Sequence, residues 1–131
     1  YEIRLSLVGS EMCIRDSDSH NLIVAGTNDA DMVLAGNTVR KNKGGLAFAL
    51  NGQVVGELPL PVAGLMSTES AETVEEKLQA LKAALKAHGI SEDIDAFMTL
   101  AFVSLPVIPK LRLNTYGIVD VDAQQIVPAV F

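Results

Sequence analysis

Residues 46–58 read LAFALNGQVVGEL, and this stretch decides the fold because two apolar runs flank the dipeptide Asn51-Gly52. Asn-Gly readily adopts the positive φ angles of a type I′ turn, so the pattern predicts a β-hairpin over residues 46–58. A two-residue loop predicts three cross-strand pairs: Leu50 with Gln53, Phe48 with Val55, and Leu46 with Glu57. The opposite face would carry small side chains: Ala47, Ala49, Val54 and Gly56. Small side chains let another element approach closely, so we expect both faces to be at least partly covered.

The segment before the hairpin predicts a capped helix. Residues 27–29 (TND) offer side-chain oxygens to the unpaired amides of a first turn, and Asp31 adds a negative charge where the helix dipole favours it. Basic side chains then precede the pair Gly44-Gly45, which favours a stop. We therefore expect a helix over residues 29–42.

The segment after the hairpin predicts a longer, amphipathic helix. Apolar side chains recur there at helical spacing: Val74, Leu78, Leu81 and Leu85. A cap at Ser67 or Ser70 would begin this helix, and Gly89 would end it. Its single apolar stripe should rest on a sheet.

Two further apolar runs predict buried strands, at residues 21–26 (NLIVAG) and residues 97–103 (FMTLAFV). Two prolines exclude residues 58–64 (LPLPVAG) from a central strand, so we expect an extended connection over the core. Residues 116–128 favour short extended pieces. Together these elements predict an α+β domain of two layers, in which two main helices pack on a mixed sheet.

Residues 1–17 differ from the rest of the chain, because they mix charged and apolar side chains without a helical or strand period. We predict no helix or strand there. Residues 8–17 (VGSEMCIRDS) look like translated read-through of a sequencing adaptor, so we treat residues 1–17 as non-native or disordered and residues 18–131 as the domain. The alternative is a genuine disordered or linking N-terminus. The one cysteine, Cys13, lies in this segment.

The composition excludes several classes of partner. The chain of 131 residues has 16 acidic and 10 basic side chains, a net charge of −6 and an isoelectric point near 4.7. This acidic balance argues against nucleic acid and against an anionic lipid surface as partners. No apolar run approaches the roughly 20 residues of a membrane-spanning helix, and one cysteine cannot form an intramolecular disulfide. We expect a cytoplasmic protein with no membrane partner.

Candidate metal and cofactor sites are few in this sequence. The two histidines, His20 and His88, form no metal-binding motif, and there is no cysteine pair, so no metal site and no cofactor-binding residue are predicted. His88 falls in the last turn of the second helix, where a structural role is expected. Residues 28–31 (NDAD) lack the glycine and distal glutamate of a calcium loop, and Gly44-Gly45 lacks the lysine of a P-loop.

Four consecutive polar side chains precede the first predicted strand: Asp18, Ser19, His20 and Asn21. A carboxylate near an imidazole can fix its tautomer or raise its basicity, which suits acid/base chemistry or substrate orientation. Alternate residues of a strand share a face, so Asp18 and His20 could meet there. The alternative is a polar strand entry whose side chains satisfy loop amides.

Four motifs, read in order, resemble the C-terminal domain of bacterial and archaeal adenine deaminases: residues 18–29 (DSHNLIVAGTND), 57–67 (ELPLPVAGLMS), 97–102 (FMTLAF) and 105–109 (LPVIP). The resemblance runs from residue 18 to the end of the chain. It implies a hydrolase that converts adenine and water to hypoxanthine and ammonia, in an amidohydrolase-type barrel that binds manganese or iron.

The metal-binding histidines and carboxylates of that family's barrel have no matching positions in this chain. The resemblance therefore implies that a missing N-terminal barrel is the partner of this domain, that the fragment alone is inactive, and that the whole enzyme could be a homo-oligomer. It also suggests that Asp18, Ser19, His20 and Asn21 lie near the active-site mouth. Composition alone allows an alternative, a stand-alone α+β binding module that self-associates through residues 59–66 and 105–111.

Overall fold

The structure is a computed structural model that describes residues 11–15, 22–91 and 93–129. These residues form three helices and two antiparallel sheets. In chain order the elements are β1 (Glu11–Arg15), β2 (Leu22–Ala25), α1 (Asp29–Lys41), β3 (Gly45–Leu50), β4 (Gln53–Pro59), α2 (Ala71–Ala87), α3 (Ala96–Val103), β5 (Leu111–Asn114), β6 (Gly117–Asp120) and β7 (Gln125–Val127). Within these ranges, the helices lack the length and apolar character that crossing a bilayer requires.

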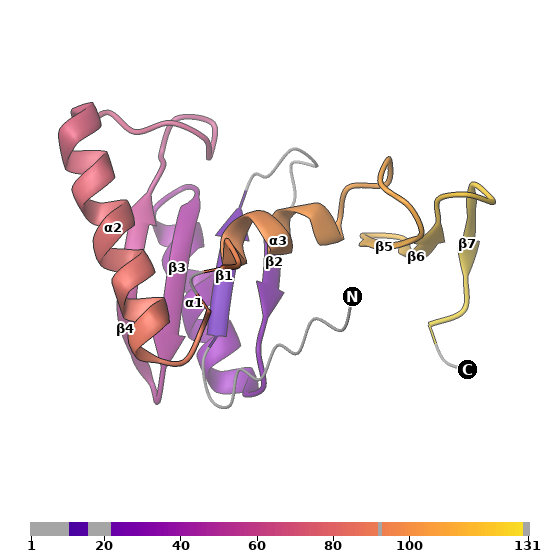
Figure 1. Ribbon diagram of the computed structural model, residues 1–131, viewed down its shortest axis with the longest axis horizontal. Helices are drawn as coiled ribbons and strands as arrows, with labels where there is room; N and C mark the ends of the chain where they lie inside the picture. Colours follow the sequence, from indigo (N-terminus) through magenta and orange to yellow (C-terminus); the bar gives the residue numbers. More distant parts are fainter. Residues whose placement is uncertain (1–10, 16–21, 92, 130–131) are drawn as a thin grey trace.

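The main sheet has the strand order β2-β1-β3-β4 (Figure 1). Each neighbouring pair is antiparallel. The prediction of a mixed sheet is therefore wrong. The prediction that residues 1–17 contain no strand is also wrong, because Glu11–Arg15 forms β1 and pairs with both β2 and β3. Backbone hydrogen bonds on two sides define a central strand, and they do not require an alternating side-chain pattern.

The turn of the predicted hairpin is confirmed between β3 and β4. Asn51 and Gly52 have φ angles of 52° and 76°, which are the positive values that a type I′ turn requires at both central residues. Leu50 pairs with Gln53, as the two-residue loop predicts.

Beyond the turn, a β-bulge changes the register of the hairpin between Phe48 and Ala49. The other two predicted pairs are therefore wrong: Phe48 faces Gly56 instead of Val55, and Leu46 faces Leu58 instead of Glu57. The bulge inserts one unpaired residue, which moves Gly56 beneath α2. A Cβ atom at Gly56 would lie 2.7 Å from the Cδ1 atom of Leu81, so a larger residue would disturb this packing.

Helices cover both faces of the main sheet, as the small residues of the hairpin predict. α1 packs on the small-residue face, where Ala35 and Val39 meet Ala47 and Ala49. The prediction that Gly56 shares this face is wrong, because the bulge turns Gly56 to the face that α2 covers. On the other face, α2 packs along β4, and α3 lies over β1 and β2 (Figure 1). That face contains the larger core: Phe48, Leu58, Leu81, Leu85, Ala96, Phe97 and Leu100. The α+β class is confirmed, with three layers where two were expected.

The two main helices begin and end close to their predicted limits. Asn28 caps the start of α1 and Asn42 caps its end. Ser70, one of the two predicted caps, begins α2, and His88 ends it directly before Gly89. The capping chemistry of these short polar residues therefore sets both lengths.

The strand predicted at residues 97–103 is instead the helix α3. The Asp95 side chain accepts a hydrogen bond from the Met98 backbone N–H at 3.1 Å and caps the first turn. A short, continuous apolar run fits a buried strand and a buried helix equally well, so its periodicity does not discriminate. The helix-capping residue Asp95, directly before this run, is the signal that favours a helix.

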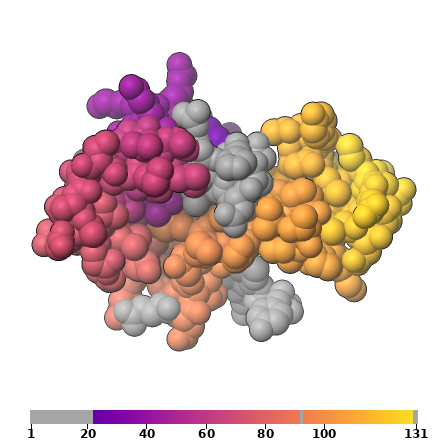
Figure 2. Space-filling view, turned by 90° about the horizontal axis from the view of Figure 1, so that it is seen from above, coloured from indigo at the N-terminus to yellow at the C-terminus, as the bar shows by residue number. Residues whose placement is uncertain are grey.

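A second, smaller sheet follows α3, with the strand order β5-β6-β7. This confirms the expectation of short extended pieces near the C-terminus. Residues 105–129 form the lobe at the yellow end of the colour scale (Figure 2). They contain no fully buried residue, although many of them are apolar.

Candidate functional site

One end of the main sheet gathers the ends of four strands. Arg15, the last residue of β1, pairs with Leu22 of β2 and with Gly45 of β3. Gly45 in turn pairs with Pro59, the last residue of β4. The four candidate residues join β1 to β2 and lie outside the described residues: Asp18, Ser19, His20 and Asn21. Of the strand ends on either side of them, Arg15 lies next to Gly45, whereas Leu22 and Pro59 lie in the two outer strands of this row.

The pair Gly44-Gly45 brings two segments of backbone together at this end of the sheet. The Leu60 N–H donates to the Gly44 carbonyl at 3.1 Å. A Cβ atom at Gly44 would lie 2.3 Å from the Gly64 Cα atom, and one at Gly45 would lie 2.0 Å from the Leu58 carbonyl oxygen. Both glycines also have positive φ angles. Only glycine allows this contact, which explains the pair without a phosphate ligand.

The contact with Gly44-Gly45 fixes the loop of residues 60–66 (LPVAGLM) against the sheet. Within the loop, Val62 and Met66 exchange two backbone hydrogen bonds of 3.0 and 3.1 Å. Ala63 has a φ angle of 56°, which costs a residue with a Cβ atom about 1 kcal/mol. Such strain persists where surrounding contacts determine the conformation.

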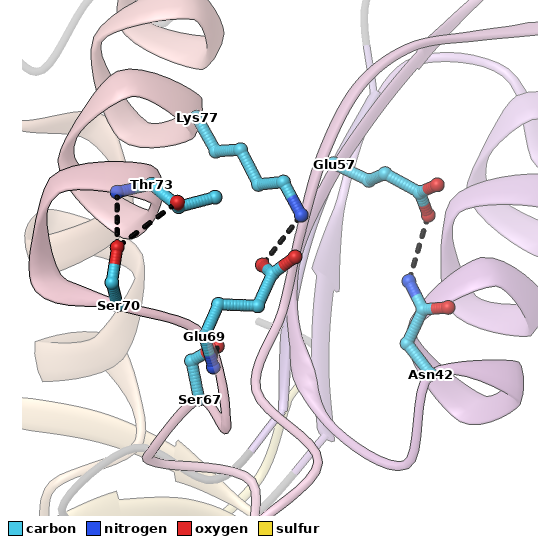
Figure 3. Close-up of polar contacts among 7 residues, drawn as sticks. All are labelled: Asn42, Glu57, Ser67, Glu69, Ser70, Thr73 and Lys77. Carbon is cyan, nitrogen blue, oxygen red and sulfur yellow. Dashed lines mark hydrogen bonds and ion pairs between the residues drawn. The ribbon is translucent and has the colours of Figure 1, made fainter.

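Polar contacts hold the chain on both sides of this loop (Figure 3). Before the loop, the Asn42 side-chain amide donates to the Glu57 carboxylate at 2.7 Å, which ties the end of α1 to β4. After the loop, the Ser67 hydroxyl accepts a hydrogen bond from the Glu69 N–H, and the Glu69 carboxylate pairs with Lys77 of α2 at 2.5 Å. The loop is therefore anchored at its entry and at its exit.

The loop itself presents apolar side chains to solvent. Val62, Leu65 and Met66 are exposed, and residues 60–66 contain no ionisable side chain. It therefore cannot transfer protons. It can bury apolar surface against a partner or exclude water from a neighbouring site.

Glu72 lies in the first turn of α2, a few residues after this loop. Hydrogen bonds from its own backbone N–H and from the Ser70 side chain lower the pKa of its carboxyl below the ordinary value of 4.5. A negative charge at this position also complements the helix dipole. Glu72 therefore stabilises the start of α2 when it is ionised.

Asp31 has a role that the sequence analysis missed, at the opposite end of the sheet. Its side chain is only 1 % exposed. The carboxylate accepts hydrogen bonds from the backbone N–H groups of Asn51 and Gly52 at 2.9 and 2.7 Å, and from the Asn28 side chain at 3.2 Å. It therefore ties the start of α1 to the hairpin turn. The helical spacing could have predicted this burial, because Asp31 precedes the buried residues Ala35 and Val39 by four and eight residues and so shares their face of α1.

His88 has the structural place that its sequence position predicts. It is the C-cap of α2, and its ring lies 5.7 Å from the ring centroid of Phe48. Among the residues that the structure describes, no three histidine, cysteine, aspartate or glutamate side chains come together in a way that could hold a metal ion. Residues 28–31 act as a helix cap, as expected.

Known proteins match most of this chain. The family of adenine deaminase C-terminal domains matches residues 16–125. A protein of Carboxydothermus hydrogenoformans named adenine deaminase 2 is 50% identical over 111 residues, which cover 85% of this chain and 20% of that protein. An adenine deaminase of Kosmotoga olearia is 56% identical over 104 residues, or 79% of this chain and 18% of its own length.

One relative aligns with almost the whole chain. An adenine deaminase of Cereibacter sphaeroides is 43% identical over 128 residues, which cover 98% of this chain and 22% of that protein. The chain thus spans about a fifth of the length of the curated relatives it matches.

Proposed function

Because the chain belongs to the family of adenine deaminase C-terminal domains, we propose that it is the C-terminal part of an enzyme that hydrolyses adenine to hypoxanthine and ammonia. The observation that carries the proposal is the match over residues 16–125, at identities of 43–56% to proteins named adenine deaminase. A role in adenine catabolism and purine salvage in the cytoplasm belongs to the same proposal. We also propose residues 18–131 as the family's domain and residues 1–17 as a segment of non-native origin, of which Glu11–Arg15 pairs with β2 and β3 as β1.

We assign the chemical step to the part of the enzyme that precedes this domain. The family resemblance implies a barrel with manganese or iron, which would activate the attacking water. The described residues here do not fit such a metal, because they contain no group of three suitable ligands. We therefore place the metal in the preceding barrel and expect this chain alone to be inactive.

For this domain we propose a role at the mouth of the active site. Two features support it: the anchored, apolar loop of residues 60–66, and the strand ends that flank Asp18, Ser19, His20 and Asn21. The apolar loop would exclude water, while a polar side chain such as His20 would orient substrate or carry a proton. The loop lies at the end of the main sheet where β1 ends and β2 begins, so the loop and the polar segment would offer complementary chemistry.

The function is tested by recovering the coding sequence upstream of residue 18 and assaying the longer protein with adenine and manganese. We expect hypoxanthine and ammonia in equal amounts. An upstream reading frame without the paired histidines of a barrel would contradict the proposal, as would a native start codon near residue 18. The second of these results would favour a stand-alone binding module.

The place of His20 is tested in that longer protein by the substitution His20→Ala. We expect kcat/KM for adenine to fall by about a hundredfold to ten-thousandfold, because a positioned acid or base contributes on that order. The matched control is His88→Ala, since His88 caps a helix and packs on Phe48. Unchanged kinetics for a folded His20→Ala variant would remove His20 from the active-site mouth.

A further inference from the structure

The sheet β5–β7 has no core of its own. From residue 105 to residue 129 no side chain is fully buried. Several large apolar side chains of this segment are strongly exposed: Val107, Leu111, Leu113, Tyr116 and Ile126. A small sheet is stable in water only when one face packs against something else, so an uncovered apolar sheet indicates a missing partner.

The strand register identifies the apolar face. Leu113 lies opposite Ile118, and Ile118 lies opposite Val127, so these three side chains share one face with Leu111. Polar Asp120 and Gln125 end this face beside Leu111. The other face carries Val119, Ile126 and Arg112, and the Arg112 guanidinium donates to the carbonyl oxygens of Leu111 and Pro109 at 2.7 Å each. We call the first set, Leu111, Leu113, Ile118 and Val127, the leucine face.

The leucine face continues into a groove against the main sheet. This groove has a volume of about 290 Å³ and is lined by residues of β2, of the end of α3 and of the turn after β5, including Leu22, Val24, Val103 and Leu113. β2 is the outermost strand in the order of the main sheet. The apolar surface therefore joins the small sheet to an outer strand of the larger one.

We propose that the leucine face and this groove are the docking surface for the part of the enzyme that precedes this domain, an inference that rests on the proposed function. The length of the missing chain identifies this occupant. The chain spans about a fifth of its relatives, and its family is a C-terminal domain, so about four-fifths of each relative precedes the matched region. A covalently attached partner has a high effective concentration, so a modest apolar surface suffices to hold it.

The occupant is tested by hydrogen–deuterium exchange in a chimera. The chimera is the Carboxydothermus hydrogenoformans relative with its matched region replaced by the matched residues of this chain. We expect amides of β5–β7 to exchange about tenfold or more slowly in the chimera than in the isolated 131-residue chain. Equal exchange in the two proteins would overturn the proposal. Protection that rises with concentration of the isolated chain would overturn it as well, in favour of a second copy.

Two exposed apolar side chains test the surface itself. Leu113 is 51% exposed on the leucine face, and Val33 is 61% exposed on α1, which covers the opposite face of the main sheet. In the chimera, Leu113→Ser should lower the protection of β5–β7 by about tenfold, because burial of a leucine is worth at least that factor. Val33→Ser should leave the protection of β5–β7 unchanged. Equal loss of protection in both variants would contradict the assignment of this face.

Adenine hydrolysis and the protection of β5–β7 are measured separately in the chimera, so the docking surface and the proposed function can fail independently. A chimera that hydrolyses adenine without protecting β5–β7 overturns the docking surface alone. A chimera that protects β5–β7 without hydrolysing adenine overturns the function alone. The wild-type comparison does not depend on any substitution, so a variant that fails to fold does not affect it.

Discussion

The three-layer body, formed by β1–β4 and α1–α3, buries its apolar side chains, whereas the small C-terminal sheet β5–β7 exposes them. In the body, helices cover both faces of a four-stranded sheet and bury side chains such as Phe48 and Val39 completely. In the small sheet, Leu113 and Tyr116 remain 51% and 81% exposed. Both regions have apolar sequences, so composition does not cause the difference. The body contains its own covering elements, whereas the small sheet requires them from elsewhere.

The largest expected effect comes from removing the carboxylate that joins two elements of the body. Asp31→Ala should lower the free energy of unfolding by about 3–5 kcal/mol, because it removes a buried carboxylate that accepts two backbone hydrogen bonds from the hairpin turn, and a hydrogen bond to a charged group contributes about 1.5–3 kcal/mol. Urea denaturation followed by circular dichroism measures this change. The control is Asp29→Ala, an exposed aspartate in the same turn, which should cost under about 1 kcal/mol. Equal costs would contradict the role of Asp31 as a clamp.

A matched pair of leucines compares the two regions directly. Leu81→Ala should lower the free energy of unfolding by about 2–5 kcal/mol, since Leu81 is 1% exposed in the core. Leu113→Ala in the small sheet should cost under about 1 kcal/mol in the isolated chain. Urea unfolding of both variants tests the difference. Similar costs at the two positions would show that the small sheet shares the core of the body.

The close contact between Gly44 and the loop of residues 60–66 predicts a difference between two glycine substitutions in the body. Gly44→Ala should cost about 2–4 kcal/mol, because the added Cβ meets backbone and the φ angle is strongly positive. Gly52→Ala also sits at positive φ but meets no atom within 4 Å, so it should cost about 1 kcal/mol. Thermal unfolding of the two variants separates the clash from the backbone strain. A smaller loss for Gly44→Ala than for Gly52→Ala would contradict the close contact.

The smallest expected effect is the pH dependence of α2. The folded-state pKa of Glu72 is lowered, so its contribution to stability is fully present above the ordinary value of 4.5 and is lost as the pH falls through the lower, folded-state value. Glu72→Gln should therefore be slightly less stable than wild type at pH 7, match wild type at pH values below the folded-state pKa, and show a weaker acid dependence of unfolding between these limits. Glu76→Gln is the control on the same helix. Identical acid titrations of wild type and Glu72→Gln would contradict this role.

Local chemistry predicted the elements whose limits are set by single residues. The sequence predicted the Asn51-Gly52 turn, the Ser70 cap and the end of α2 before Gly89, and the structure confirms all three. Each depends on a preference of one or two residues for a particular backbone conformation, and neighbouring elements do not change that preference.

Features that depend on distant contacts could not be predicted in the same way. The bulge at Phe48 is favoured by the packing of Gly56 against Leu81, which lies 25 residues further along the chain. β1 is defined by backbone pairing with two other strands. The burial of Asp31 depends on the position of a turn that begins 20 residues later. These tertiary contacts override local pattern.

The candidate site was predicted only in part. The family resemblance includes residues 57–67, and the structure shows that the loop within them is apolar, anchored by hydrogen bonds and located at the end of the main sheet where β1 ends and β2 begins. The role of Gly44-Gly45 in holding this loop was not visible in the sequence. A glycine pair fits many kinds of close backbone contact, and only the coordinates identify which segment approaches it.

The rate of adenine hydrolysis by the chimera with the Carboxydothermus hydrogenoformans relative tests whether this domain serves an adenine deaminase. Its kcat/KM is compared with that of the parent enzyme and of the parent lacking the matched C-terminal region. We expect a value for the chimera within about tenfold of the parent and far above that of the truncated enzyme, because a tenfold change corresponds to only about 1.4 kcal/mol. A folded chimera no more active than the truncated enzyme would contradict this expectation.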